Sequence, residues 1–209
     1  LAYWQGGNAN GDGFDSHLPS IMDFPLQEAI NAALSESNPG WGQGMYRVYN
    51  AIAHDAPYHD LSKMMIFLSN HDHYRIADSW HQDPDKMKIA YSLPATVRGI
   101  PQLFYGDEMM FATGKGYKSD GELRMDFPGG WQGDEKDLFT EEGRQGTDAE
   151  LYDYARKLFR WRKDNEVIHD GRTMHFLTRD NTYAFFRYND AGKVFVYINN
   201  SLDEKTIPW

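Results

Sequence analysis

The sequence contains no cysteine, so it forms no disulfide bond and offers no thiolate ligand for zinc. It also has few basic residues: 21 Lys and Arg stand against 31 Asp and Glu, which gives a net charge of -10. This balance argues against a nucleic-acid partner, because binding to phosphates requires clustered positive charge. No apolar run approaches the roughly 20 residues that cross a bilayer, so no membrane partner is expected.

The apolar patterns predict strands that alternate with helices in the first part of the chain. Short buried strands are predicted at residues 20–24, 64–68 and 100–105, and helices from Pro25, over 45–55, over 84–98 and from Thr147. Thr147 and Glu150 have the spacing of a capping box. Continuously apolar strands are typical of parallel sheets covered on both faces, so this part is α/β.

The pattern changes after His169. The segments "RTMHFLTRD", "TYAFFRYN" and "KVFVYINN" alternate in polarity and are separated by turn residues, which predicts an antiparallel block. We therefore expect two parts, an α/β region over residues 1–168 and an antiparallel region over residues 169–209.

Polar side chains follow two of the predicted parallel strands. In "FLSNHDHYRI", Asn70, His71 and Asp72 come directly after the apolar run, and Arg75 lies just beyond. In "YGDE", Asp107 follows the next strand. Functional groups of parallel α/β folds gather where strands end, although Asn and Asp at these positions also cap turns.

Two kinds of site fit these residues. His71 and His73 with Asp107 have a pattern found in metal-dependent barrel hydrolases, but a metal needs three or four convergent ligands, and the other His residues do not follow predicted strands. We therefore expect no metal. Alternatively, Asp72 could contact sugar hydroxyls and stabilise a cationic transition state, a chemistry that requires two further carboxylates.

The motifs resemble those of the α-amylase superfamily. "FLSNHDHYR" is similar to the Asn-His-Asp motif after barrel strand seven, "RGIPQLFYGDEMMF" to strand eight and its loop, and "HLPSIMDFPLQEAI" to the strand six region. "LRMDFPGGWQGDEKDLF" resembles the neopullulanase and cyclomaltodextrinase branch. The resemblance implies the C-terminal portion of a (β/α)8 TIM barrel, about strands 6–8, followed by the start of an antiparallel β-sandwich domain.

The resemblance also implies roles for individual residues. Asp72 would be the catalytic carboxylate that stabilises the transition state, and His71 and Arg75 would bind substrate near the cleaved bond. Asp120 and Arg124 would grip the neighbouring sugar, although "SDGELR" departs from the usual context and an ion pair or loop cap explains it equally well. Three Trp residues are candidate sugar-stacking platforms, with core packing as the alternative: Trp4, Trp41 and Trp131.

The family's nucleophilic Asp and general-acid Glu belong to motifs that would precede this segment. We therefore expect a fragment of a retaining glycoside hydrolase that is inactive alone, whose parent cleaves α-1,4-glucosidic bonds in maltooligosaccharides, cyclodextrins or pullulan. Any calcium ion would belong to the rest of the parent. The unpaired strand edges of a partial barrel favour self-association. The resemblance to the neopullulanase and cyclomaltodextrinase branch implies a bacterial periplasmic or extracellular enzyme.

Two alternative functions stay open. One is a non-catalytic relative that binds glucans or acts as an interaction protein, and the other is a metal-dependent hydrolase.

Overall fold

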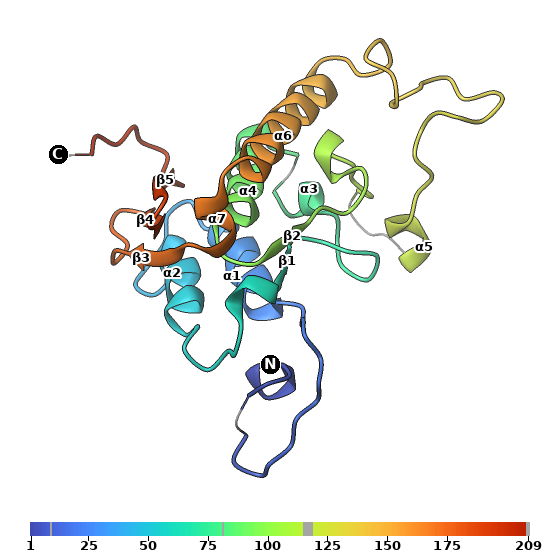
Figure 1. Ribbon diagram of the computed structural model, residues 1–209. Helices are drawn as coiled ribbons and strands as arrows, with labels where there is room; N and C mark the ends of the chain where they lie inside the picture. The colour runs from blue at the N-terminus through green and yellow to red at the C-terminus, as the bar shows by residue number, and fades with distance from the viewer. Residues whose placement is uncertain (9, 81, 115–118, 208–209) are drawn as a thin grey trace.

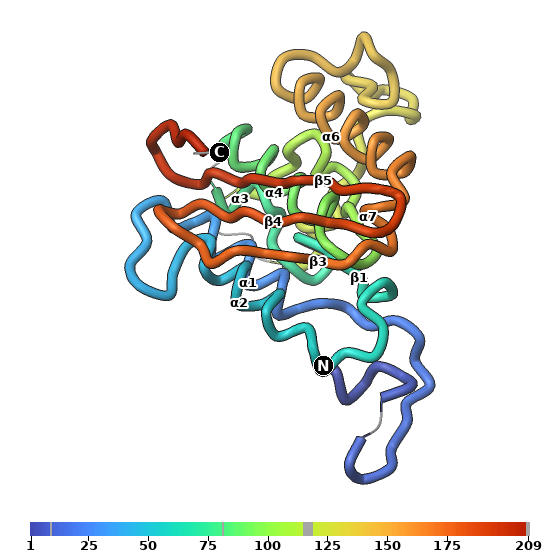
Figure 2. Tube along the Cα trace, turned by 60° about the vertical axis from the view of Figure 1, so that its left-hand side comes forward, coloured from blue at the N-terminus to red at the C-terminus, as the bar shows by residue number. Residues whose placement is uncertain are grey.

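The computed structural model describes residues 1–8, 10–80, 82–114 and 119–207. It contains a parallel two-stranded sheet, β1–β2, and an antiparallel three-stranded sheet in the order β3–β4–β5. Helices surround the parallel pair, and the antiparallel sheet packs at one side of the molecule (Figure 1). The N-terminal segment projects away from this body, as both ribbon and tube views show (Figures 1 and 2).

The parallel strands are β1 (Met65–Phe67) and β2 (Ile100–Gln102), with Met65 opposite Ile100. A third parallel segment adjoins them through a single bridge between Met22 and Met65, where Met65 N–H donates to Ile21 O at 2.9 Å. The predicted strands at 64–68 and 100–105 are therefore confirmed but shorter, and the one at 20–24 is reduced to a bridge. The three segments lie side by side in chain order.

The principal helices begin where the sequence predicts. Asp23 caps the first by accepting from Leu26 N–H at 3.1 Å, and Asp83 caps the third by accepting from Asp85 N–H at 2.9 Å; each cap precedes a proline in the first turn. The helices are α1 (Phe24–Ser35), α2 (Met45–Ala53), α4 (Pro84–Thr96) and α6 (Thr147–Lys163). Shorter helical pieces are η1 (Ala2–Trp4), η2 (Leu61–Lys63), α3 (Ile76–Ser79), η3 (Asp107–Met109), α5 (Asp120–Leu123) and α7 (Glu166–Asp170).

The predicted capping box at the start of α6 is wrong. Gly146, with φ 58°, occupies the N-cap position, and Thr147 is already the first helical residue. Glu150 instead reaches α4, where its carboxylate pairs with Lys88 Nζ at 2.5 Å. The Glu150 side chain therefore forms an ion pair with another helix instead of the hydrogen bond at its own helix N-terminus that a capping box requires.

The antiparallel sheet consists of β3 (Arg172–His175), β4 (Thr182–Asn189) and β5 (Gly192–Asn199), which confirms the predicted antiparallel block. Alternate residues of β4 such as Tyr183 and Phe185 are fully buried against the helical part, as the alternating pattern requires. Figure 2 shows the sheet in front of α1 and α2.

A buried ion network ties the parallel segments to the helices. Arg98, after α4, pairs with Asp23 at 2.5 Å and with both carboxylate oxygens of Asp55, just after α2. Burial raises the pKa of Asp55, whereas the Arg98 guanidinium acts to lower it. Because each charge has a partner, the network is tolerated inside the molecule.

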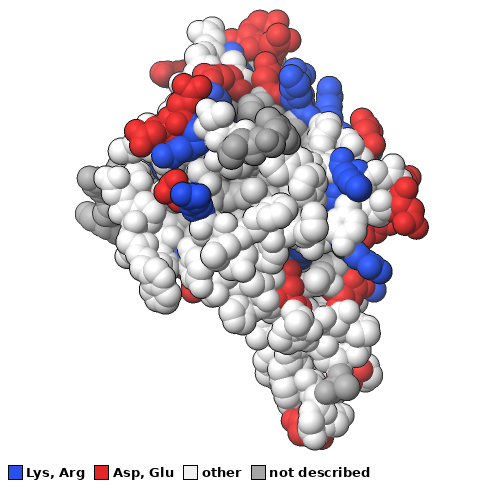
Figure 3. Space-filling view, turned by 90° about the vertical axis from the view of Figure 1, so that its left-hand side faces the viewer, with Lys and Arg blue, Asp and Glu red and all other residues white. Residues whose placement is uncertain are grey.

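Part of the face that carries the antiparallel sheet is uncharged. In the space-filling view, Lys, Arg, Asp and Glu gather toward the top and one edge, and a broad area between them lacks such residues (Figure 3). Exposed apolar side chains of β3 and the turn after it include Met174, Phe176 and Leu177. Within the described part of the chain, no helix has the length and apolar character needed to cross a membrane.

Candidate functional site

Asp72 lies at the carboxyl end of β1, in a loop shaped by Asn70. The Asn70 side-chain oxygen accepts from the Asp72 backbone N–H at 2.8 Å and lies 2.9 Å from His73 Nδ1. Asn70 is itself buried. A short polar side chain therefore folds the loop onto itself immediately after the strand, which fixes where the Asp72 carboxylate is presented.

Three of the predicted site residues meet at this point, and we call Asp72, His71 and Arg124 the Asp72 cluster. Arg124 Nη2 donates to Asp72 Oδ1 at 2.9 Å, and His71 Nε2 lies 3.2 Å from Asp72 Oδ2. Arg124 Nε also donates to the His71 carbonyl oxygen at 3.1 Å. The Asp72 side chain remains 57% exposed. The cluster thus holds an accessible carboxylate between two nitrogen groups.

Arg75 is placed beneath the cluster rather than beside it. Its side chain is fully buried, and Phe104 lies under the guanidinium with 4.0 Å to the ring centroid. Nη1 donates to Asp107 Oδ1 at 3.2 Å, and Nε donates to the Leu123 carbonyl oxygen at 3.1 Å. In this arrangement Arg75 faces protein groups instead of solvent. It joins the loop after β1 to α5, next to which Arg124 lies.

Asp107 supplies the counter-charge for Arg75. Its carboxylate also accepts a hydrogen bond from the Ser69 hydroxyl, so the ends of β1 and β2 are linked. Burial raises the pKa of Asp107 to about 7, although the Ser69 hydroxyl and the Arg75 guanidinium both act to lower it. The sequence indicated polar groups after both strands, but nothing in "YGDE" distinguishes Asp107 as the partner of an Arg over the adjacent Glu108.

Asp120 is not brought into the cluster. It begins α5, while Arg124 follows the same helix. Among the residues that the structure describes, Arg124 forms its ion pair with Asp72 and not with Asp120. The resemblance implied that these two residues grip one sugar together; in the structure the Arg124 guanidinium contacts the Asn-His-Asp loop.

The two histidines of the loop have different surroundings. His71 contacts Asp72, whereas the His73 ring packs against Phe24, with centroids 5.5 Å apart. Across residues 1–8, 10–80, 82–114 and 119–207, no three His, Asp or Glu side chains come together as metal ligands. The geometry of the loop therefore gives no support to the metal-dependent alternative.

The arrangement can stabilise positive charge beside a bound polar ligand. An exposed carboxylate that accepts a hydrogen bond from Arg124 and lies next to His71 needs little reorganisation when a cation develops beside it. The remaining N–H groups of Arg124 and the imidazole of His71 are suited to hydroxyl groups.

Comparisons with known proteins agree with the sequence motifs. The family described as "Cyclo-malto-dextrinase C-terminal domain" matches residues 173–209. The chain is 24% identical to a beta/alpha-amylase of Paenibacillus polymyxa over 92% of its own length and 15% of the relative's, and 24% identical to a cyclomaltodextrinase of Geobacillus thermopakistaniensis over 95% and 30%. The chain thus spans less than a third of either relative.

A solved structure agrees at the level of the fold. The α-amylase of Geobacillus thermoleovorans complexed with acarbose superposes with a TM-score of 0.66 and 21% identity, over 88% of this chain and 36% of that one. The chain is therefore a mixed α/β segment that aligns with part of an α-amylase structure and ends in a small antiparallel sheet.

Proposed function

We propose that residues 1–209 are a region of an α-amylase-family glycoside hydrolase that ends in a cyclomaltodextrinase-type C-terminal domain, and that the enzyme containing it is a retaining glycosidase for α-1,4-glucosidic bonds. Its substrates are maltooligosaccharides, cyclodextrins or pullulan. The proposal places the enzyme in the periplasm or outside a bacterial cell.

The observation that carries this proposal is the Asp72 cluster at the carboxyl end of β1. The carboxylate is exposed, and Arg124 at 2.9 Å and His71 at 3.2 Å hold it in place. In glycoside hydrolysis the anomeric carbon becomes cationic in the transition state. A fixed negative charge beside that carbon binds the transition state more tightly than the neutral substrate, which accelerates the reaction.

The other residues of the site divide into two roles. His71 and Arg124 donate hydrogen bonds to hydroxyls of the sugar at the cleavage position, and Asp120, one helical turn from Arg124, contacts the neighbouring sugar. Arg75 is a positioning residue, because its buried guanidinium links the loop after β1 to α5. The nucleophilic Asp and the acid Glu are supplied by another part of the parent, so this segment alone has no glycosidase activity.

The fold supports an assignment within the barrel. We assign the segment around Met22, β1 and β2 to strands six to eight of a (β/α)8 barrel, because three neighbouring parallel segments follow one another in chain order. Residues 1–168 belong to the barrel, and residues 169–209 begin an antiparallel β-sandwich. The exposed apolar side chains of β3 and its turn suit the inner face of such a sandwich.

The test is Asp72→Asn in the full-length enzyme, assayed on maltoheptaose. We expect kcat to fall by at least about 1,000-fold, with KM changed by less than about threefold, because the amide keeps the shape and loses the charge. Asp85→Asn is the matched control, since Asp85 is an exposed residue of α4 outside the cluster. Near-normal kcat in Asp72→Asn would overturn the proposal.

A further inference from the structure

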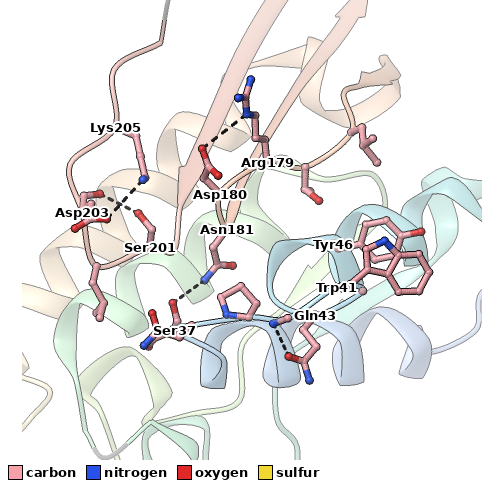
Figure 4. Close-up of a pocket in the computed structure, with 17 residues that line it drawn as sticks. Ser37, Trp41, Gln43, Tyr46, Arg179, Asp180, Asn181, Ser201, Asp203 and Lys205 are labelled. Carbon is pink, nitrogen blue, oxygen red and sulfur yellow. Dashed lines mark hydrogen bonds and ion pairs between the residues drawn. The ribbon is translucent and has the colours of Figure 1, made fainter.

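A cavity of about 840 Å³ lies between the helical part and the antiparallel sheet, away from the Asp72 cluster. One wall is the α1–α2 connection, residues 37–43, and the other is formed by the β3–β4 turn and the segment after β5. Figure 4 shows Trp41 and Tyr46 on one side and Asp203 and Lys205 on the other. In Figure 1, α5, next to which Arg124 lies, is on the opposite side of the molecule from β4 and β5.

The cavity is built on a rigid floor. The Asn181 side chain is buried; its oxygen accepts from Met45 N–H at 3.0 Å, and its amide donates to the Glu36 carbonyl oxygen at 2.9 Å. Glu36 in turn holds Arg47 through paired hydrogen bonds. One side chain of the β3–β4 turn thus fixes the α1–α2 connection, so the two walls keep their spacing without a ligand.

Trp41 presents an aromatic surface at the mouth of this cavity. Its side chain is 98% exposed, which differs from the core packing that is usual for Trp. The ring lies against Tyr46, with centroids 6.4 Å apart and an interplanar angle of 28°. Trp41 lies in the α1–α2 connection, where Gly40 N–H donates a hydrogen bond to Gln43 Oε1 at 2.7 Å. The indole is therefore an aromatic surface that is open to a ligand ring.

The polar groups around the cavity balance one another in charge. Arg179 lies 3.8 Å from Asp180, and Lys205 lies 3.7 Å from Asp203. The cavity therefore offers many hydrogen-bonding groups without a net charge. This combination suits a neutral ligand with an apolar ring face and many hydroxyls, and it does not suit a phosphorylated or carboxylated ligand.

We propose that this cavity is a second oligosaccharide-binding site, in which a pyranose ring stacks on Trp41 and its hydroxyls bond to the polar side chains of the β3–β4 turn. The choice of an α-glucan as the oligosaccharide rests on the proposed function; the existence of the site does not. The site combines residues from both sides of position 168, and no residue of the Asp72 cluster lines it.

Affinity electrophoresis of the 209-residue chain in gels that contain soluble starch tests this proposal. The native chain is expected to be retarded, and Trp41→Ala is expected to weaken the apparent affinity by at least about tenfold, since a central aromatic anchor carries much of the binding. Phe139→Ala is the matched control, because Phe139 is also an exposed aromatic residue (65%) but lies outside the cavity. Circular dichroism is the check that Trp41→Ala retains the native fold.

Asp72→Asn in the same gels separates this proposal from the function of the cluster. Retardation that survives Asp72→Asn and is lost in Trp41→Ala supports the second site. Retardation that is absent, or that is lost in Asp72→Asn and kept in Trp41→Ala, overturns it, whatever the kinetic assay of Asp72 shows. Adsorption of the full-length enzyme to insoluble starch is a second measurement. We expect adsorption to be kept in Asp72→Asn and weakened in Trp41→Ala.

Discussion

At the scale of single residues, Arg75 determines how the site is supported. Its guanidinium bonds to Asp107 and to the carbonyl oxygens of Leu123 and Tyr105, all from inside the protein. A planar group with several fixed donors can serve these acceptors at once. A lysine has one nitrogen and cannot reach them together, although it keeps the positive charge.

We therefore predict that Arg75→Lys lowers the free energy of unfolding of the 209-residue chain by about 2–4 kcal/mol, as expected for a disrupted buried pair. Urea denaturation followed by circular dichroism measures the change. Arg156→Lys is the control: Arg156 pairs with Asp153 on the exposed face of α6, and the expected loss is under about 0.5 kcal/mol. An unchanged midpoint in Arg75→Lys would mean that Arg75 has no supporting role.

The sequence predicted the position of the Asp72 cluster but not its supporting contacts. The Asn-His-Asp loop after an apolar run is local, so it can be recognised from the residues themselves. The burial of Arg75 and its pairing with Asp107 depend on how α5 and the loop after β2 close over the strand, and no local pattern contains that information. The turn of Arg124 toward Asp72 instead of Asp120 is likewise a tertiary contact.

At the scale of elements, helices were predicted more accurately than strands. Proline and aspartate at the starts of α1 and α4 fix those ends locally. Strand length depends on how far a neighbour remains paired, and β1 and β2 pair over only three residues. The residues after Gln102 are apolar enough for a strand, but they leave the ladder and lead into the loop that presents Asp107.

The antiparallel sheet contains a pH-sensitive contact. His175 of β3 lies with Nδ1 2.9 Å from the Tyr183 hydroxyl, and its ring is tilted against Tyr49. Burial lowers the pKa of His175, although the Asp55 carboxylate acts to raise it. The unfolded chain therefore takes up this proton more readily than the folded chain. The resulting stabilisation is present above pH about 6.5 and is lost as the pH falls toward the lowered value in the folded protein.

We predict that His175→Gln reduces the loss of stability between pH 7.5 and pH 5.5, measured as the shift in the urea midpoint. His54→Gln, at an exposed position just after α2, should retain the native dependence. If His175→Gln and the native chain lose equal stability over this interval, His175 does not contribute to it.

At the scale of the whole molecule, the α/β region and the antiparallel sheet are joined by buried hydrogen bonds. Asn200, after β5, donates to the Ala33 carbonyl oxygen at 2.8 Å, and Arg187 of β4 donates to the Ile168 carbonyl oxygen of α7 at 3.1 Å. Together with the Asn181 contacts, these bonds hold the two predicted regions, residues 1–168 and 169–209, in one packed body. The composition change at His169 therefore marks a change of architecture and not a flexible linker.

We propose that the charge of Asp72 faces the anomeric carbon when that carbon is cationic. The most direct test compares, in the full-length enzyme, the affinity for acarbose, whose amine can carry a positive charge, with the affinity for neutral maltoheptaose. The claim predicts that Asp72→Asn weakens acarbose binding by about 30-fold or more and maltoheptaose binding by less than about threefold, because only the cationic ligand loses a charge partner. Equal weakening of both ligands, or none of either, would contradict the claim.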